Sequence, residues 1–178
     1  VDYPGFENQE APDMETYSKA LNGGQYPLSV LAVNERAANV YAKGTYGNTM
    51  TTNPRAMDIA TNVLNSLTPE IRANIRGKGQ EALDKLNVLK AELGGLMTKV
   101  QGTGLLFSCE LDPSFKCYGA NSTEEYMRER GIGVIHGGIN SLRFTPHFAI
   151  TSAELDLIIA HIRVALLKGP RKSAAEAA

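Results

Sequence analysis

Apolar positions recur at helical spacing along two long stretches of the chain. The first stretch runs from residue 68 to about residue 93, with apolar positions at Ile71, Ile75, Ala82, Leu86, Leu89 and Leu93. The second follows residue 151, with apolar positions at Leu155, Ile158, Ile159, Ile162 and Leu166. Steps of three, four and seven residues place each set along one helical face. We therefore predict two amphipathic helices that pack their apolar faces into a core.

Local signals mark the ends of these and other helices. Gly94-Gly95 stops the first long helix, and Gly169-Pro170 terminates the second. Thr151 with Glu154 forms a capping box that opens the second helix. Ser122 to Glu125 forms another capping box, which predicts a helix as far as about residue 130.

Shorter segments alternate between strand and helix patterns. Strands are predicted up to residue 18 and at residues 27–33, 105–111, 132–135 and 141–144, and helices at residues 35–41 and 54–67. Strands and helices alternating in this way favour an α/β fold.

Composition bounds the kind of molecule. The chain has 178 residues, of which 43% are hydrophobic and 21% charged, and its net charge is −1. This is enough for one sizeable core or two small ones. Near-neutral charge gives no electrostatic case for nucleic acid or an anionic membrane, and no apolar run reaches membrane-spanning length.

The two cysteines and three histidines suggest no metal site. Cys109 and Cys117 lack the histidine spacing of a zinc site, and we interpret them as free thiols in a reducing compartment. The histidines are scattered singly along the chain. We therefore expect a cytoplasmic protein without a bound metal.

Lys19 stands at the end of a strand-like run, just before the pair Gly23-Gly24. A lysine amine becomes a nucleophile or base when desolvation or nearby positive charge lowers its pKa, and the neutral amine forms Schiff bases with aldehydes. The glycines allow a tight turn and the close approach of a flat ligand. An ordinary solvated lysine in a turn explains these residues as well.

A run rich in hydroxyl and amide groups, Thr49 to Pro54, precedes a predicted helix. Asn53 suits the N-cap and Pro54 the first helical position. Hydroxyl donors in front of a helix start can bind an anion. Alternatively, Asn53 merely caps its helix and the threonines fill a surface loop.

Arg143 lies between Leu142 and Phe144 in a predicted strand. A guanidinium fork matches a carboxylate with two hydrogen bonds, so an arginine in this setting is a candidate carboxylate ligand. The alternative is an arginine on the solvent face of an alternating strand.

Taken together, these segments resemble the class III, subgroup II, aminotransferases of fold type I, which depend on pyridoxal phosphate. This family includes the ornithine, acetylornithine, lysine-epsilon and 4-aminobutyrate aminotransferases. The matching segments cover nearly the whole chain and are residues 12–24, 26–29, 49–54, 99–111 and 140–148. The segment at residues 26–29 is closest to the ornithine branch. Met50 departs from the aromatic residue of the family's loop, and Thr51-Thr52 departs from its glycine pair.

The resemblance implies a domain organisation. Residues 1–67 would form the C-terminal part of the large domain that binds pyridoxal 5'-phosphate. Residues 68–168 would form a linking helix and the small C-terminal domain, and we expect residues 169–178 to be a disordered tail.

It also implies site residues and a reaction. Lys19 would hold pyridoxal 5'-phosphate through a Schiff base and move a proton during catalysis. Thr49 would reach the cofactor phosphate of the partner subunit in a homodimer, and Arg143 would bind the α-carboxylate of the substrate. The expected activity is transfer of an amino group from an ω-amino acid or amine to a 2-oxo acid, with 2-oxoglutarate as the expected acceptor. An aminomutase or decarboxylase of the same fold remains an alternative.

Part of the family's cofactor machinery has no counterpart in this chain. The family carries, upstream of its lysine, an aspartate that pairs with the pyridinium nitrogen, a phosphate-binding glycine turn and an aromatic residue on the ring. Asp2 lies much closer to Lys19 than that aspartate lies to its lysine. We therefore expect the C-terminal part of a larger enzyme, with a missing N-terminal segment or chain. A non-catalytic fragment or partner subunit, unable to hold the cofactor by itself, is the other alternative.

Overall fold

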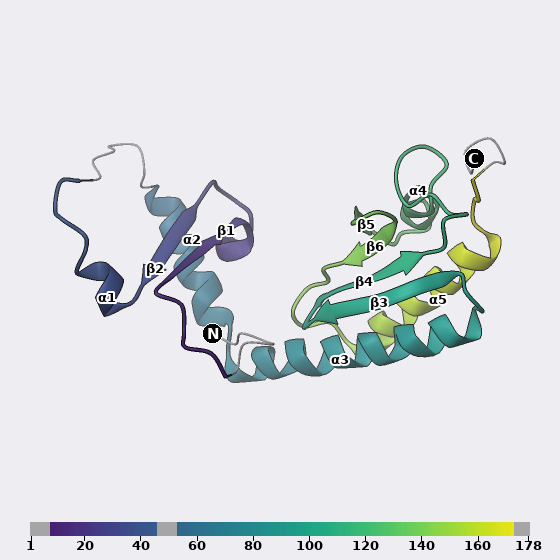
Figure 1. The fold of residues 1–178 in the computed structure, drawn as a ribbon, viewed down its shortest axis with the longest axis horizontal. Coiled ribbons are helices and arrows are strands. Elements are labelled where there is room, and N and C mark those ends of the chain that lie inside the picture. The colour runs from purple at the N-terminus through teal and green to yellow at the C-terminus, as the bar shows by residue number, and fades with distance from the viewer. Residues whose placement is uncertain (1–7, 46–52, 173–178) are drawn as a thin grey trace. The chain divides into compact units, whose positions relative to one another are not determined.

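The computed structural model describes residues 8–45 and 53–172 of the chain (Figure 1). The chain divides into two compact units, with the boundary between Thr68 and Pro69. Each unit is described by itself.

The first unit contains a β-hairpin followed by helices. Strands β1 and β2 pair antiparallel, from Met14 opposite Val33 to Ser18 opposite Ser29. The elements are β1 (Met14–Ser18), the 3-10 helix η1 (Lys19–Asn22), β2 (Ser29–Val33), α1 (Glu35–Ala38) and α2 (Pro54–Ser66).

Helix α2 begins as the sequence predicts. The side-chain oxygen of Asn53 accepts hydrogen bonds from the backbone N–H groups of Arg55 and Ala56, and Pro54 occupies the first turn. Helix α2 packs against η1. Its buried residues are the small Ala56 and Ala60, while η1 buries Asn22.

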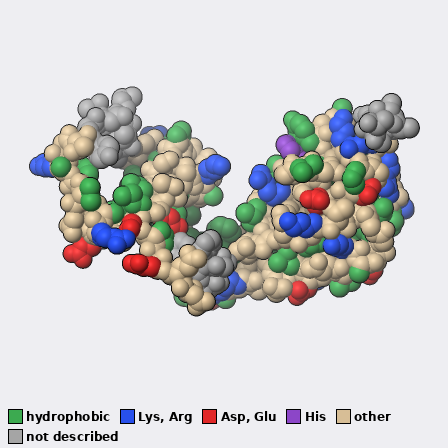
Figure 2. All heavy atoms as spheres, viewed as in Figure 1, with side chains coloured by type: hydrophobic (Ala, Val, Ile, Leu, Met, Phe, Trp, Pro, Cys, Tyr) green, Lys and Arg blue, Asp and Glu red, His purple; other side chains and the backbone are tan. Residues whose placement is uncertain are grey.

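Hydrophobic side chains are exposed on the first unit (Figure 2). They come from both strands, from the segment that follows α1 and from α2, and include Met14, Leu31, Val40, Tyr41 and Leu64. Exposed apolar area of this kind is typical of a surface that another polypeptide segment covers.

The second unit is an antiparallel sheet with helices. Its strands follow the order β3-β4-β6-β5, and α3 packs against β3, β4 and α5. The elements are α3 (Pro69–Glu92), β3 (Met97–Thr103), β4 (Leu106–Leu111), α4 (Thr123–Arg128), β5 (Ile135–Gly137), β6 (Ser141–Phe144) and α5 (Ser152–Lys168).

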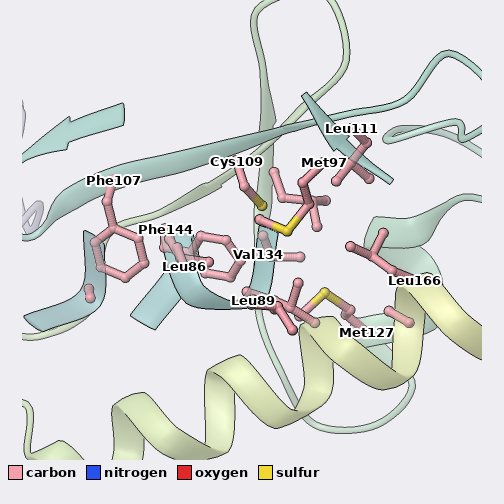
Figure 3. Close-up of a cluster of buried hydrophobic side chains, with 14 of the residues drawn as sticks. Leu86, Leu89, Met97, Phe107, Cys109, Leu111, Met127, Val134, Phe144 and Leu166 are labelled. Carbon is pink, nitrogen blue, oxygen red and sulfur yellow. The ribbon is translucent and has the colours of Figure 1, made fainter. Parts of the chain in front are cut away.

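The core of the second unit lies between its helices and its sheet (Figure 3). Helix α3 contributes Leu86 and Leu89, and β4 contributes Phe107, whose ring stacks on Phe144 with centroids 5.3 Å apart. From α5, Leu155, Ile162 and Leu166 are buried. The two predicted apolar stripes therefore form core faces.

The sequence reading missed β3 and misplaced β5. Most residues of β3 are exposed, because β3 is an edge strand held by backbone pairing to β4. An exposed edge carries little apolar alternation from which to recognise it. The strand predicted at residues 132–135 is observed at Ile135–Gly137, where pairing to β6 defines it.

The first residues of the expected tail contact the second unit. The guanidinium of Arg171 lies 3.9 Å from the centre of the Phe115 ring and donates a hydrogen bond to Ser114 Oγ. The backbone N–H of Lys172 donates to the Ser114 carbonyl oxygen. A cation–π contact and hydrogen bonds therefore connect Arg171 and Lys172 to residues 114–115.

Within the described ranges, no helix combines the length and the hydrophobicity needed to cross a membrane.

Candidate active site

Lys19 begins η1 directly after β1, and its side chain is exposed. Its backbone has φ 56°, in the left-handed region. A residue with a Cβ atom pays roughly 1 kcal/mol or more for this conformation. The surrounding turn must therefore hold Lys19 in place.

Hydrogen bonds fix the turn on both sides of Lys19. Before it, Ser18 Oγ donates to the carbonyl oxygen of Leu28 at 3.0 Å. After it, the buried Asn22 donates from Nδ2 to the carbonyl oxygen of Tyr26 at 2.9 Å. Both bonds close the same loop, so the path of the chain through Lys19 is set by its neighbours. Sequence reasoning missed these two side chains, because their partners are backbone carbonyls of the following loop.

The region around Lys19 leaves room for a ligand. Among the described residues, none forms a hydrogen bond or ion pair with the Lys19 amine. Gly23 and Gly24 have φ of 65° and 71°, and no atom lies within 4 Å of a Cβ built on either. The predicted tight glycine turn is therefore present.

Asn22 carries a buried oxygen without a donor. Its Oδ1 has no hydrogen-bond partner in the part of the chain that the structure describes, although the residue is fully buried. Such a buried acceptor costs roughly 1–3 kcal/mol until a donor satisfies it. The Lys19 amine, which bonds to no described residue, has the chemistry needed by a cofactor that attaches covalently to lysine.

Two of the sequence-predicted positions, Thr49 and Asp2, lie outside the described residues. The helix that follows the Thr49 segment is α2, and it packs against η1, which begins at Lys19. The fold therefore brings the start of that helix and the lysine turn into one unit.

Arg143 lies in β6, directly opposite Ser108 of β4 and Ile135 of β5. Its neighbours Leu142 and Phe144 are buried, whereas Arg143 is exposed. No hydrogen bond or ion pair with another described residue occupies its guanidinium. The fork is thus free to bind a carboxylate. Lys19 lies in the first unit and Arg143 in the second.

The cysteines are not candidate nucleophiles. Both are free thiols and both are buried. Burial raises the pKa of Cys117 to about 12 and raises the pKa of Cys109 well above its usual range. Protonated thiols of this kind are inert. Over the described ranges, no group of three metal-ligating side chains comes together.

A separate hollow of about 210 Å³ lies in the second unit. Its lining includes Lys116, Tyr118, His136 and Lys172, but neither Lys19 nor Arg143. The ring of His136 packs on Tyr118, and its Nδ1 lies 3.7 Å from a carboxylate oxygen of the buried Glu124. Sequence reasoning did not find this hollow, because its lining comes from three separate segments.

Comparison with known proteins gives a consistent family. The family profile described as aminotransferase class-III matches residues 6–166. A curated relative, the succinylornithine transaminase of Citrobacter koseri, is 32% identical over 145 residues, which are 81% of this chain and 35% of the relative.

Solved structures agree. The acetylornithine aminotransferase from Elizabethkingia anophelis is 26% identical, with a TM-score of 0.77 over 89% of this chain and 42% of that one. The ornithine aminotransferase from Toxoplasma gondii, crystallised with oxidised glutathione and with partial occupancy of PLP at its active site, is 25% identical. Its TM-score is 0.76 over 90% of this chain and 38% of that one.

These matches confirm the α/β, fold type I class predicted from the sequence. The chain spans about two fifths of the length of these solved relatives. Because the family profile covers nearly all of the sequence, the chain belongs to the class-III aminotransferases.

Proposed function

We propose that this chain supplies the cofactor lysine and the carboxylate-binding arginine of an aminotransferase that depends on pyridoxal 5'-phosphate. The observation that carries the proposal is Lys19, an available amine in a left-handed turn after β1, within a chain that matches the family over residues 6–166. A lysine in a strained conformation, with no ion-pair partner in the described part of the chain, favours a functional role.

In this proposal Lys19 would hold the cofactor covalently, through its Nζ at the aldehyde carbon of the cofactor. The cofactor, when bound, supplies an electron sink for the bonds of the substrate's reacting carbon. As a neutral amine, Lys19 Nζ would accept the proton from the substrate's reacting carbon, and as an ammonium it would then donate that proton to the C4′ carbon of the cofactor. The bonds of Ser18 and Asn22 fix the backbone turn from which the Lys19 side chain extends.

The proposed substrates are an ω-amino acid or amine as donor and a 2-oxo acid, with 2-oxoglutarate as the acceptor. Relatives named for ornithine, acetylornithine and succinylornithine support this class of donor. The acceptor's α-carboxylate would bind the guanidinium of Arg143 through two parallel hydrogen bonds.

The proposed assembly is a homodimer in which Thr49 reaches the cofactor phosphate of the partner subunit. Asn53 Oδ1 already accepts hydrogen bonds from the N–H groups of Arg55 and Ala56, so in this proposal the Thr49 hydroxyl, and not these amides, would hold the phosphate. A further polypeptide segment, in the same chain or another, would supply the aspartate for the ring nitrogen. The exposed apolar residues of the first unit and the partial coverage of the relatives support such a segment.

Product analysis tests the reaction class. The native assembly is incubated with ornithine or another ω-amino acid, with and without 2-oxoglutarate. Aminotransfer predicts glutamate formed only when both substrates are present, in a one-to-one ratio with the new carbonyl compound. Release of carbon dioxide, or an isomer of the amino acid without any need for the 2-oxo acid, would identify a decarboxylase or aminomutase instead.

Substitution of Arg143 tests the carboxylate site. Arg143→Lys keeps the charge but loses the two-pronged fork, so kcat/KM toward 2-oxoglutarate should fall by about a hundredfold. Loss of one charge-assisted bidentate contact, roughly 3 kcal/mol, accounts for this size. An amine without a carboxylate should react almost normally in its own half-reaction. Equal losses for both substrate types, or none, would make Arg143 a structural residue.

A further inference from the structure

Gly137 of β5 lies beneath the side chain of Arg143. A Cβ atom built on Gly137 would lie 3.6 Å from Cβ, 3.7 Å from Cδ and 4.0 Å from Nε of Arg143. Arg143 itself pairs with Ile135, and Gly137 pairs with Ser141. The arginine stem therefore crosses diagonally to the neighbouring strand and runs along the bare backbone of Gly137.

The backbone conformation does not require glycine at this position. Gly137 lies outside the left-handed region, whereas the next residue, Gly138, has φ 54°. A side chain at residue 137 is therefore compatible with the strand. A Cβ atom at residue 137 would stand in ordinary van der Waals contact with the arginine stem, so what the glycine leaves open is the space beyond a methyl group.

The Arg143 stem runs at contact distance from a Cβ built on Gly137, so the size of the residue there can affect the direction of the guanidinium. In the described part of the second unit, no carboxylate or carbonyl group holds its nitrogen atoms. A single methyl group at residue 137 would be in ordinary contact with the Arg143 stem. A branched side chain would extend further and crowd the stem. A displaced fork loses the geometry on which bidentate carboxylate binding depends.

We propose that Gly137 is a positioning residue, which sets the direction of Arg143 and thereby the affinity for the α-carboxylate of the substrate. This inference rests on the proposed function, in which Arg143 binds that carboxylate. Gly137 itself touches neither substrate nor cofactor in this account.

The test compares Gly137→Val with a matched control, Gly133→Val, in the native assembly. Gly133 also lies outside the left-handed region, and no atom lies within 4 Å of a Cβ built on it. The readouts are the dissociation constant of 2-oxoglutarate, measured by calorimetry, and the half-reaction of an amine without a carboxylate. Gly137→Val should weaken 2-oxoglutarate binding by about ten- to a hundredfold, since a misplaced group can cost about a hundredfold.

The other variants distinguish crowding of Arg143 from a general structural effect of the substitution. Gly137→Ala should stay within about threefold of the parent protein, because a methyl group fits at contact distance. Gly137→Thr, whose side chain has the same branched shape as that of valine, should reproduce the loss and replaces Gly137→Val if that variant does not fold. The amine half-reaction and the Gly133→Val protein should match the parent. In an Arg143→Ala background, Gly137→Val should cause no further loss of binding.

Three results would overturn the inference. One is an equal loss of the amine half-reaction, and another is a loss that persists in the Arg143→Ala background, because both indicate a general structural role. The third is weaker binding of 2-oxoglutarate in Arg143→Lys with normal binding in both Gly137→Val and Gly137→Thr. That result would keep Arg143 as the carboxylate ligand and remove the role of Gly137. Normal binding in Arg143→Lys would instead remove the carboxylate site, and this inference with it.

Discussion

Lys19 is the residue whose backbone is least expected. The residues with positive φ that are not glycine are, in the described ranges, Lys19 and Asn121. Asparagine tolerates this region because its short side chain can bond to the nearby backbone, whereas lysine has no such compensation. Lys19 therefore occupies a position whose backbone conformation suits glycine better, which favours a role for its amine.

This conformation makes a prediction about stability. Lys19→Gly should raise the free energy of unfolding of the cofactor-free protein by about 0.5–1 kcal/mol, because glycine adopts a left-handed φ without a Cβ clash. Lys19→Ala should give no such gain, because alanine keeps the Cβ atom. Urea unfolding of the two variants measures the difference. Equal stability of Lys19→Gly and Lys19→Ala would show that the backbone is unstrained at this position.

Sequence could identify the candidate residues but not what holds them. The local patterns around Lys19 and Arg143 left an ordinary surface role open for each residue, and the resemblance to the aminotransferase family made them candidates. Their supports were not found, because Asn22 bonds to a carbonyl and Gly137 acts by having no side chain. A missing side chain becomes informative only once the strand that lies beside it is known.

Helix α3 lies against the turn that joins β3 to β4. A Cβ atom built on Gly79 would lie 2.2 Å from the carbonyl oxygen of Gly104, in that turn. Backbone meets backbone here, so no flexible side chain can move aside. The approach of the helix to the sheet therefore depends on glycine at residue 79.

We predict that Gly79→Ala lowers the free energy of unfolding by about 3 kcal/mol, because the helix must move away from the turn. Gly77→Ala is the matched control on the same helix, since no atom lies within 4 Å of its added Cβ. This control should gain about 0.5–1 kcal/mol from the higher helix propensity of alanine. Thermal or urea unfolding followed by circular dichroism compares them. Similar stability of the two variants would refute the close contact.

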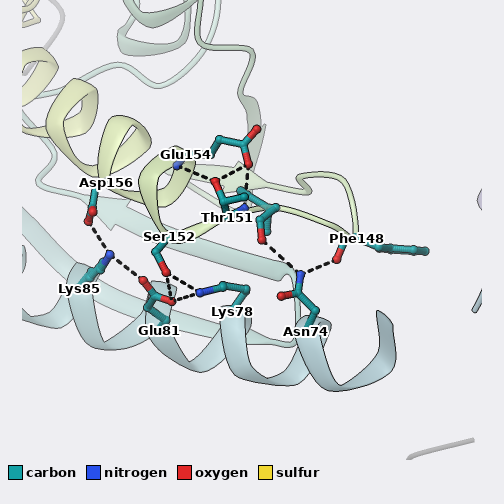
Figure 4. Close-up of polar contacts among 10 residues, drawn as sticks. Asn74, Lys78, Glu81, Lys85, Phe148, Thr151, Ser152, Glu154 and Asp156 are labelled. Carbon is teal, nitrogen blue, oxygen red and sulfur yellow. Dashed lines mark hydrogen bonds and ion pairs between the residues drawn. The ribbon is translucent and has the colours of Figure 1, made fainter. Parts of the chain in front are cut away.

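Polar side chains also join α3 to α5 (Figure 4). Glu81 accepts hydrogen bonds from Lys78 at 2.7 Å and from Ser152 of α5 at 3.0 Å, and pairs with Lys85 at 2.7 Å. Lys85 in turn pairs with Asp156 of α5. The hydrogen bond from Lys78, with that from Lys85, lowers the pKa of Glu81 from 4.5 to about 2.

The lowered pKa gives a dependence of stability on pH. A carboxyl group whose pKa is lower in the folded state stabilises the fold above its unfolded pKa and loses this contribution as the pH falls through the folded value. The window is therefore from about 4.5 down to about 2. Across it the parent protein should lose about 1–2 kcal/mol more than Glu81→Gln, after allowing for solvent screening.

Urea unfolding at several pH values between about 5 and 2 measures this difference. Glu92→Gln, which removes one charge from the same helix at an exposed pair with Arg163, is the control. Parallel stability curves for the parent and Glu81→Gln would show that the network does not lower the pKa of Glu81.

At the scale of elements, periodicity was the reliable signal. The stripes that predicted α3 and α5 form core faces, and the capping box at Thr151 and Glu154 is present. Edge strand β3 was missed, and β5 is three residues from its predicted start. Both strands are defined by pairing to a neighbour, which the local pattern of apolar residues does not encode.

At the scale of the molecule, the proposed cofactor lysine and the proposed carboxylate-binding arginine lie in different units. The first unit carries Lys19 and a surface with exposed apolar side chains, and the second carries Arg143 on its antiparallel sheet. The family assignment rests on a match across both units, over residues 6–166. The fold class and family followed from the sequence, which also led us to expect Lys19 and Arg143 in separate domains, at residues 1–67 and 68–168.

The attachment site of the cofactor tests the account most directly. The native assembly is loaded with pyridoxal 5'-phosphate, reduced with borohydride and digested, and the peptides are mapped by mass spectrometry. The account predicts a pyridoxyl group on Lys19 in the parent protein and no modified peptide from a Lys19→Ala assembly. A pyridoxyl group on another lysine of the loaded assembly, or a reduced cofactor released without any attachment, would contradict it.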